Sequence, residues 1–147
     1  DPGQGLPMFN GEELMNFINH ADYVAANDYE AKLLQERTGK SIEELSRRVK
    51  ALVVTQGAQG SLVVVNGKSE TIPIVTPAQV VDPTGCGDAY RAGLLYGIAN
   101  DLDWPTTGRL ASLLGSLKIA QRGAQNHQFT RDEISQRFRE AFGRAPW

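Results

Sequence analysis

The run DPTGCGDAYRAGLL, residues 82–95, is the stretch that decides the fold. In it Gly85 and Gly87 stand where a loop turns into an apolar helix, and Asp88 follows them directly. Glycines let successive backbone N–H groups converge without a Cβ in the way, and the helix dipole adds partial positive charge there. The corner is therefore predicted to bind an anion, with Asp88 placed to accept a proton from a hydroxyl that attacks a bound phosphoryl group. From these residues alone, a plain tight corner in which Asp88 complements the helix dipole explains the pattern equally well.

Outward from this run, the chain alternates between helical and strand-like periodicity. The pattern predicts helices over residues 12–18, 28–37, 41–49, 89–98, 107–121 and 130–142, and strands over residues 23–26, 51–55, 61–65 and 69–74. Asn66-Gly67 is the commonest pair for a type I′ turn, so the last two strands are expected to form a hairpin. Val80-Val81 leads into the glycines, which places them at a strand-to-helix corner. This order predicts an α/β sandwich with a mostly parallel sheet and one antiparallel ribbon.

Composition limits the classes of protein that need consideration. The chain has 147 residues, 41% hydrophobic and 22% charged, with a net charge of −2, so it can form one real core and offers no basic surface for nucleic acid. One cysteine, Cys86, excludes a disulfide framework, and with only His20 and His127 beside it a zinc site is not expected. A reducing cytoplasm fits best. No apolar run approaches the roughly 20 residues that span a bilayer, so no membrane partner is predicted.

The whole run 82–95 resembles the second signature of the PfkB/ribokinase family of sugar and nucleoside kinases. That signature joins an Asp, a Gly-x-Gly-Asp turn, an aromatic residue two positions later and paired small residues in the next helix. The resemblance implies that Gly85, Cys86 and Gly87 form an anion hole and that Asp88 is the catalytic base. The family more often has Ala or Ser at position 86, but only the backbone N–H is needed there.

Three further segments match the family in the right order. Asn27-Asp28-Tyr29-Glu30 has its Asn-x-x-Glu pattern, which implies that Asn27 and Glu30 organise Mg²⁺ and the phosphate end of ATP; a helix capping box explains the same pair. The run TQGAQG, residues 55–60, is similar to the family turn in which Thr55, Gly57 and Gly60 would contact the nucleotide phosphates. Taken alone it is an ordinary loop.

The third segment, residues 122–125, resembles the loop that borders the adenine pocket. It implies a nucleotide contact at Gly123 and, as in many relatives, a K⁺ site shared with Asp82. A helix C-cap at Gly123 accounts for the glycine equally well.

These matches imply a ribokinase-like three-layer α/β/α sandwich in which residues 1–147 form the C-terminal, nucleotide-binding part and the N-terminal substrate and lid half is absent. The expected activity is ATP- and Mg²⁺-dependent phosphoryl transfer to a hydroxyl of a sugar or nucleoside, with a ribosyl substrate such as adenosine or ribose favoured. The alternative is a nucleotide-binding fragment without activity of its own. An exposed strand edge would favour self-association, so a homo-oligomer remains open.

Other classes fit less well. No stretch supplies the P-loop spacing Gly-x-x-x-x-Gly-Lys-Ser/Thr, and the Gly-x-Gly comes too late in the chain for a dinucleotide fold. A cysteine hydrolase would use Cys86, whose position at a helix start predicts a depressed pKa. Nothing in the sequence places His20 or His127 beside it, and both are expected to be structural.

Overall fold

The computed structural model describes residues 1–147, which form two compact units, residues 1–71 and 72–147. The first unit holds the 3-10 turns η1 (Gly3–Met8) and η2 (Gly57–Gln59) and the helices α1 (Gly11–His20), α2 (Asp28–Thr38) and α3 (Ile42–Ser46). It also holds the strands β1 (Tyr23–Asn27), β2 (Ala51–Thr55) and β3 (Ser61–Val65), and all but the last residue of β4 (Lys68–Ile72). The second unit holds the helices α4 (Cys86–Ala99), α5 (Trp104–Ile119) and α6 (Arg131–Phe142). Helices that accompany a sheet confirm the predicted α/β class.

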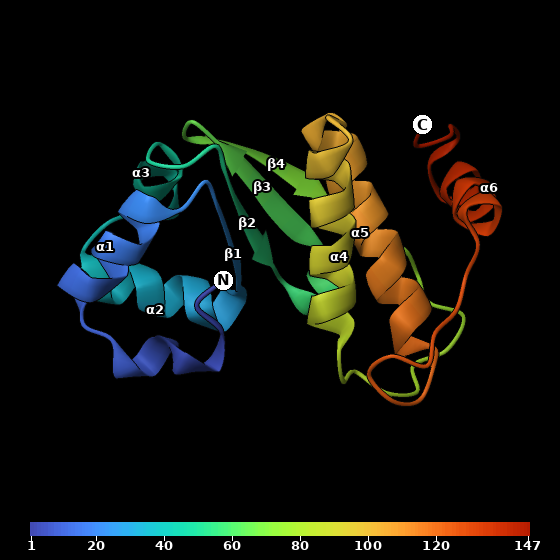
Figure 1. Cartoon of the computed structure of the whole chain (residues 1–147), viewed down its shortest axis with the longest axis horizontal. Helices are drawn as coiled ribbons and strands as arrows, with labels where there is room; N and C mark the ends of the chain where they lie inside the picture. Colours follow the sequence, from blue (N-terminus) through green and yellow to red (C-terminus); the bar gives the residue numbers. More distant parts are fainter. The chain divides into compact units, whose positions relative to one another are not determined.

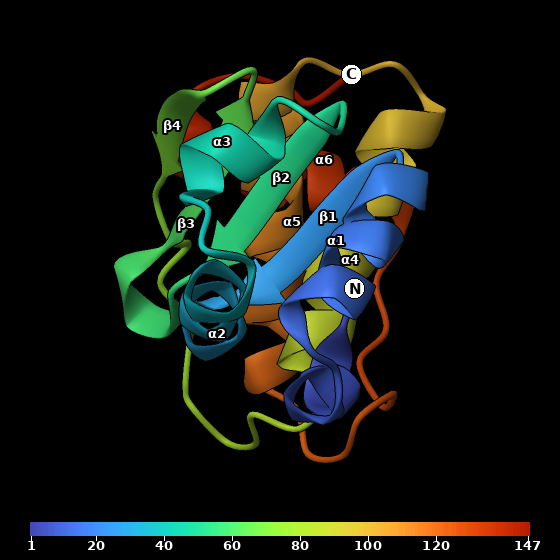
Figure 2. The ribbon, with the colours of Figure 1, turned by 90° about the vertical axis from the view of Figure 1, so that its left-hand side faces the viewer.

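The sheet has four strands in the order β1-β2-β3-β4. β1 and β2 are parallel, whereas β2 and β3 are antiparallel, so the sheet is mixed. β1 is an edge strand, and Figure 2 shows it beside β2. In the β1–β2 register, Asn27 lies opposite Thr55. The carboxyl ends of two neighbouring parallel strands therefore bring two predicted site residues side by side.

The hairpin between β3 and β4 has the predicted turn. Asn66 and Gly67 both have positive φ, 48° and 78°, as a type I′ turn requires. β4 ends at Ile72, two residues before the predicted end, because Pro73 has no N–H to extend the ladder.

The core of the first unit lies where α1, α2 and α3 cover one face of the sheet (Figure 1). Strand β2 is buried along four of its five residues, as its unbroken apolar run predicts. Its buried side chains pack with those of the three helices, among them Leu14, Ile18, Leu34 and Leu45. This packing fixes the ends of β1 and β2, from which the predicted site residues project.

The second unit is built on a close antiparallel pair, α4 and α5, seen side by side in Figure 1. A Cβ at Gly93 would lie 2.5 Å from the Cα of Ala111, and one at Gly97 would lie 2.4 Å from Oγ1 of Thr107. The small residues of the signature helix are therefore required for the two backbones to approach. α6 adds Ile134 and Phe138 to a core shared with α5.

One predicted element is absent: no strand precedes the glycines. Residues 73–85 are irregular, and Val80 is exposed. The segment is instead fastened to the end of α5, because the N–H groups of Val81 and Asp82 both donate to the carbonyl of Ile119, at 2.9 and 3.1 Å. Three prolines, at positions 73, 77 and 83, remove the donors that a strand here would need.

Two helix boundaries also differ from the prediction. α3 ends at Ser46 rather than near residue 49, because the buried Ser46 hydroxyl donates to Glu43 O and accepts from Gly67 N, which competes with helical bonding. α5 begins at Trp104, three residues early, behind an Asp103 cap and a proline in its first turn.

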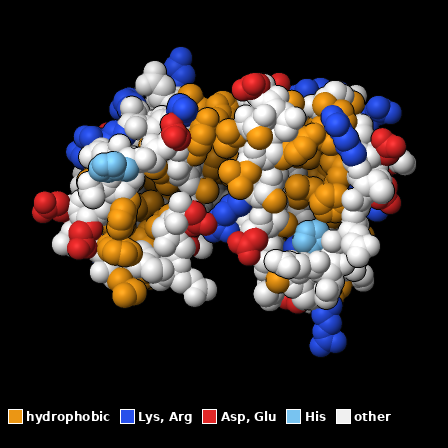
Figure 3. Space-filling model, viewed as in Figure 1, with side chains coloured by type: hydrophobic (Ala, Val, Ile, Leu, Met, Phe, Trp, Pro, Cys, Tyr) orange, Lys and Arg blue, Asp and Glu red, His pale blue; other side chains and the backbone are white.

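The surface shows no single-sign field in the view of Figure 3, where acidic and basic side chains are interspersed. None of the helices combines the length and apolar character needed to cross a bilayer.

Candidate active site

The helix start at α4 differs from every other in the chain. The helices α1, α2, α3, α5 and α6 each begin with a side chain that accepts a backbone N–H of the first turn. α4 begins with Gly85, which has left-handed φ and ψ of 80° and 4° and no side-chain cap. A Cβ at Gly85 would lie 2.9 Å from the carbonyl oxygen of Ala124, so only glycine fits.

This start leaves N–H groups without partners. The N–H groups of Gly85, Gly87 and Asp88 have no acceptor in the structure. The N–H of Cys86, predicted to join the anion hole, donates to the carbonyl of Pro83 at 3.1 Å. The unpaired donors are therefore the two predicted glycines together with the N–H of Asp88, at the positive end of a 14-residue helix.

Asp88 lies in the first turn of α4 with its side chain 84% exposed. Nη1 of Arg91 donates to its Oδ1 at 3.1 Å, one turn along the helix. This bond uses only Oδ1 of the carboxylate. The sequence reasoning did not single out Arg91, although acid and base three residues apart on a helix is a recognisable signal.

Cys86 does not have the depressed pKa that its position predicts. Burial raises the pKa of the thiol, and the carboxylate of Asp82 adds to the rise, while Lys118 only partly opposes it. The thiol lies 3.9 Å from the carbonyl oxygen of Asp82. The prediction was wrong because desolvation of this half-buried thiol outweighs the helix start.

Asp82 joins two segments of the second unit. Its Oδ1 accepts the N–H of Thr84 at 2.9 Å and its Oδ2 accepts the N–H of Gly123 at 2.8 Å. These two hydrogen bonds, with a smaller contribution from Lys118, lower the pKa of Asp82 to about 2. Gly123 is not a helix C-cap, since α5 is capped at Ala120; its φ of 79° serves the loop instead.

A buried lysine that the sequence reasoning missed lies behind this loop. Lys118, on α5, is 0% exposed, and its Nζ donates to the carbonyls of Asp82 at 2.7 Å and Gln121 at 3.1 Å. Sequence periodicity gives no warning of it, because a lysine within an apolar helix ordinarily extends its ammonium into water.

In the first unit, Asn27 and Glu30 form a complete capping box at the start of α2. Oδ1 of Asn27 accepts the N–H of Glu30 at 2.8 Å, and Oε2 of Glu30 accepts the N–H of Asn27 at 2.9 Å. Glu30 is buried, and its Oε1 has no hydrogen-bond partner. The structural explanation of this pair is confirmed, and one carboxylate oxygen remains for another role.

Thr55 ends β2 beside Asn27 and opens the turn over residues 55–60. Gly57 and Gly60 have φ of 57° and 90°, so both need glycine. The N–H of Gly60 closes the turn on the carbonyl of Gly57 at 3.2 Å, whereas the N–H of Gly57 has no acceptor. The turn thus offers a free backbone donor two residues from Thr55.

The chain contains no group of three or more His, Cys, Asp or Glu side chains that would cage a metal ion. A Mg²⁺ bound with ATP does not need such a cage, because it keeps several waters and takes one or two carboxylates with the phosphates. Glu30, with its free Oε1, fits that mode of binding.

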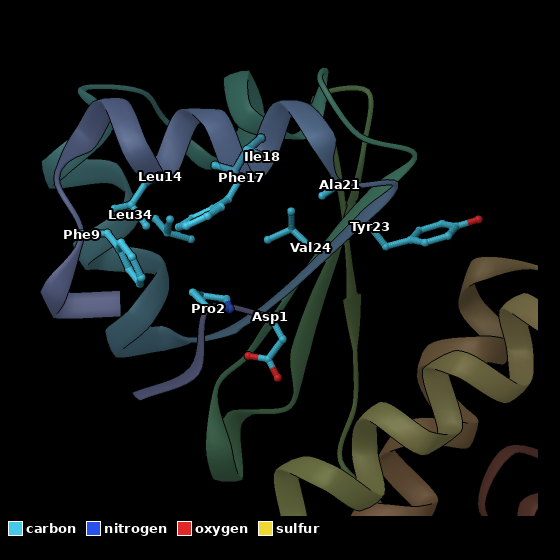
Figure 4. Close-up of a pocket in the computed structure, with 10 residues that line it drawn as sticks. All are labelled: Asp1, Pro2, Phe9, Leu14, Phe17, Ile18, Ala21, Tyr23, Val24 and Leu34. Atoms are coloured by element: carbon cyan, nitrogen blue, oxygen red, sulfur yellow. The ribbon is translucent and has the colours of Figure 1, made fainter. Parts of the chain in front are cut away.

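The pockets of the first unit are not lined by the predicted site residues. One, of about 360 Å³, opens between α1, α2 and β1 and is lined by apolar side chains such as Phe9, Phe17 and Val24 (Figure 4). None of the predicted site residues lines it. It is an opening in the hydrophobic core of this unit, with Asp1 and Pro2 at its rim.

Comparison with known proteins adds independent findings. A sequence profile of the pfkB family carbohydrate kinases matches residues 6–131. A nucleoside kinase of Methanocaldococcus jannaschii is 33% identical over 93% of the chain and 45% of its own length. A ribokinase of Bacillus subtilis is 33% identical over 81% of the chain and 40% of its own length.

Among solved structures, a Burkholderia thailandensis nucleoside kinase in complex with inosine superimposes with a TM-score of 0.95 and 53% identity. The match covers 99% of this chain and 48% of that protein. The chain thus spans about half the length of the relatives it matches.

Proposed function

This chain belongs to the pfkB family of carbohydrate kinases, and we propose that it carries the nucleotide-binding and phosphoryl-transfer half of a nucleoside kinase. The observation that carries the proposal is the start of α4. Among the α-helices it alone begins without a side-chain cap, and its free N–H groups include that of Asp88, whose carboxylate is exposed. Such a start fits an anion that arrives with the substrate.

The proposed reaction is an in-line transfer. Asp88, through Oδ2, takes the proton from a substrate hydroxyl as its oxygen bonds to the γ-phosphorus of ATP, and the bond from that phosphorus to the bridging oxygen breaks to release ADP. The N–H groups of Gly85, Gly87 and Asp88 face the charge that develops on the transferred group. Arg91 holds the carboxylate through its other oxygen.

The first unit supplies the proposed contacts to the nucleotide phosphates. The free N–H of Gly57 and the Thr55 hydroxyl would bind phosphate oxygens, and Asn27 would place its polar group beside them, as the β1–β2 register supports. Glu30 would hold Mg²⁺ through water by Oε1. Bound in this way, Mg²⁺ neutralises charge on the ATP phosphates.

For the substrate class we propose a nucleoside, phosphorylated at a ribosyl hydroxyl. The support is the 53% identity to a nucleoside kinase whose structure was determined with inosine, and the 33% identity to an archaeal nucleoside kinase. The ribokinase resemblance, also at 33%, covers a smaller share of this chain.

A coupled assay of the complete gene product with Mg²⁺-ATP tests this function. Inosine, adenosine, guanosine, cytidine, ribose and fructose would be compared at equal concentrations. We expect turnover with at least one nucleoside to exceed that with either sugar. Turnover with the sugars alone would move the proposal to a sugar kinase, and no turnover with any of them would end it.

A second function, a nucleotide-binding module that is inactive alone, is favoured by the share of the relatives that this chain covers, 45% and 48%. Catalysis needs the acceptor hydroxyl held in near-attack geometry. If residues 1–147 lack the groups that hold it, the isolated chain will bind Mg²⁺-ATP by calorimetry yet give no detectable transfer in the coupled assay. Robust turnover by the isolated chain would contradict this second function.

A further inference from the structure

The side chain of Lys118 is fully buried. Its side chain is among the largest that are fully buried, on a helix whose other buried residues are Leu, Ala, Thr and Gly. Burying an ammonium is costly unless its donors are satisfied. Here the carbonyls of Asp82 and Gln121, which lie 39 positions apart in the sequence, accept two of its three N–H donors.

These carbonyls belong to the two segments that frame the anion site. Asp82 lies just before the uncapped glycines, and Gln121 lies just before the loop that approaches Gly85 through Ala124. The Asp82 carboxylate makes a second tie between the same segments through Gly123. Lys118 therefore holds the backbone on both sides of the corner that starts α4.

The relatives' K⁺ site, inferred from sequence at Asp82 and residues 122–125, does not fit the donor set found here. Five oxygens of Asp82, Gln121 and Arg122 already accept an N–H donor. Asp82 O and Gln121 O accept Lys118 Nζ, the Asp82 carboxylate accepts Thr84 N and Gly123 N, and Arg122 O accepts Nδ2 of Asn126 at 2.8 Å. An ammonium carries the same charge as K⁺ and is close to it in size, but it binds carbonyls as a hydrogen-bond donor.

We propose that Lys118 acts as a tethered monovalent cation that positions the anion-binding corner, so that phosphoryl transfer by this protein requires no K⁺. The catalytic part of this proposal rests on the proposed function. The structural part rests only on the hydrogen bonds of Lys118. Lys118 is a positioning residue: it touches neither substrate nor phosphate, and acts through Asp82 and the residues that follow it.

The test compares K⁺ with choline at constant ionic strength, using the complete gene product in two readouts, turnover and thermal unfolding. For the wild type, we expect turnover to change less than about twofold and the midpoint of unfolding to stay the same, since no ion site is open. Lys118→Met keeps the length of the side chain without its charge, and we expect it to lose at least about tenfold in turnover with little change in KM for ATP. Lys68→Met, at an exposed lysine of β4, is the matched control and should behave as wild type.

Lys118→Ala opens room for a free ion and gives the decisive variant. We expect ammonium or K⁺, but not choline, to restore part of its turnover and to raise its unfolding midpoint. A wild type activated more than about tenfold by K⁺ would overturn the proposal. So would a Lys118→Ala variant that folds but is rescued by neither ion, or a Lys118→Met variant equal to wild type in both readouts.

If neither variant folds, the response of wild-type turnover to K⁺ still tests the proposal. If no substrate is phosphorylated, the proposed function fails while the unfolding midpoints still test the tethered cation.

Discussion

Helices α2 and α4 both begin at predicted site residues, yet their starts are built in opposite ways. At α2, Asn27 and Glu30 satisfy each other's N–H groups, so the helix start is complete without a ligand. At α4, Gly85 contributes no side chain, and the N–H groups of Gly87 and Asp88 are left open. The difference teaches that an anion site is indicated by a helix start that lacks a side-chain cap, which with glycine costs about a few tenths of a kcal/mol.

The largest expected effect is at Asp88, and it tests the difference between the two helix starts. Asp88→Asn in the complete gene product removes proton acceptance and keeps the helix, so we expect turnover to fall by at least about 10²-fold while ATP affinity by calorimetry stays almost intact. Asp132→Asn, in the first turn of the capped helix α6, is the matched control and should keep wild-type turnover. A variant at position 88 with more than half of wild-type turnover would refute the base assignment.

Gly85→Ala is expected to have the next largest effect. Left-handed φ costs a non-glycine residue about 1–2 kcal/mol, and the new Cβ would press on the carbonyl of Ala124. We expect a clear loss of stability and a fall in turnover of at least about tenfold, because the free N–H groups would shift.

The control is Gly39→Ala. Gly39 also has positive φ, 67°, but a Cβ there meets nothing within 4 Å. Chemical denaturation and turnover should therefore separate the two variants: Gly39→Ala loses about 1 kcal/mol of stability and no turnover. Equal turnover in both variants would show that the corner at Gly85 is only structural.

How much of the fold could be predicted from the sequence depends on whether each feature is set by a few neighbouring residues. The capping box at Asn27 and the turn at Asn66-Gly67 are patterns of two to four residues, and the structure confirms both. The strand expected at Val80-Val81 is absent from the structure, because two β-branched residues in a proline-rich segment are too few to form one.

The site divides in the same way. The glycines at 85, 57 and 60 follow from motif spacing, and their backbone angles confirm the need for glycine. The contacts of Lys118 could not be found, because they depend on a fold that brings residue 82 to the end of α5. The predicted direction of the Cys86 pKa was wrong because it depends on burial, which the local sequence does not show.

A smaller effect is expected at Asp82, whose carboxylate accepts the N–H groups of Thr84 and Gly123. Its pKa of about 2 lies below the ordinary value of 3.8, so its contribution to stability is fully present above pH 3.8 and is lost as the pH falls toward 2. We therefore expect the stability difference between wild type and Asp82→Asn to shrink between pH 5 and about 2 in urea denaturation. A difference that does not change over this range would contradict the two N–H bonds to the carboxylate.

Cys86→Ala should have the smallest effect. The thiol has a raised pKa, and the N–H of this residue serves the turn at Pro83 rather than a ligand. We expect turnover within about twofold of wild type and no change in its pH profile, since alanine keeps the same backbone. Loss of activity in a folded variant would revive a cysteine nucleophile.

The proposed function requires that the uncapped start of α4 receives the phosphate. Amide chemical shifts of the isotope-labelled protein, followed during titration with Mg²⁺ and a non-hydrolysable ATP analogue, test it most directly. We predict that the amides of Gly85, Gly87 and Asp88 shift markedly and saturate with the ligand, while those of the capped starts at Glu13 and Glu133 stay in place. Saturated binding that leaves Gly87 and Asp88 unmoved would contradict it.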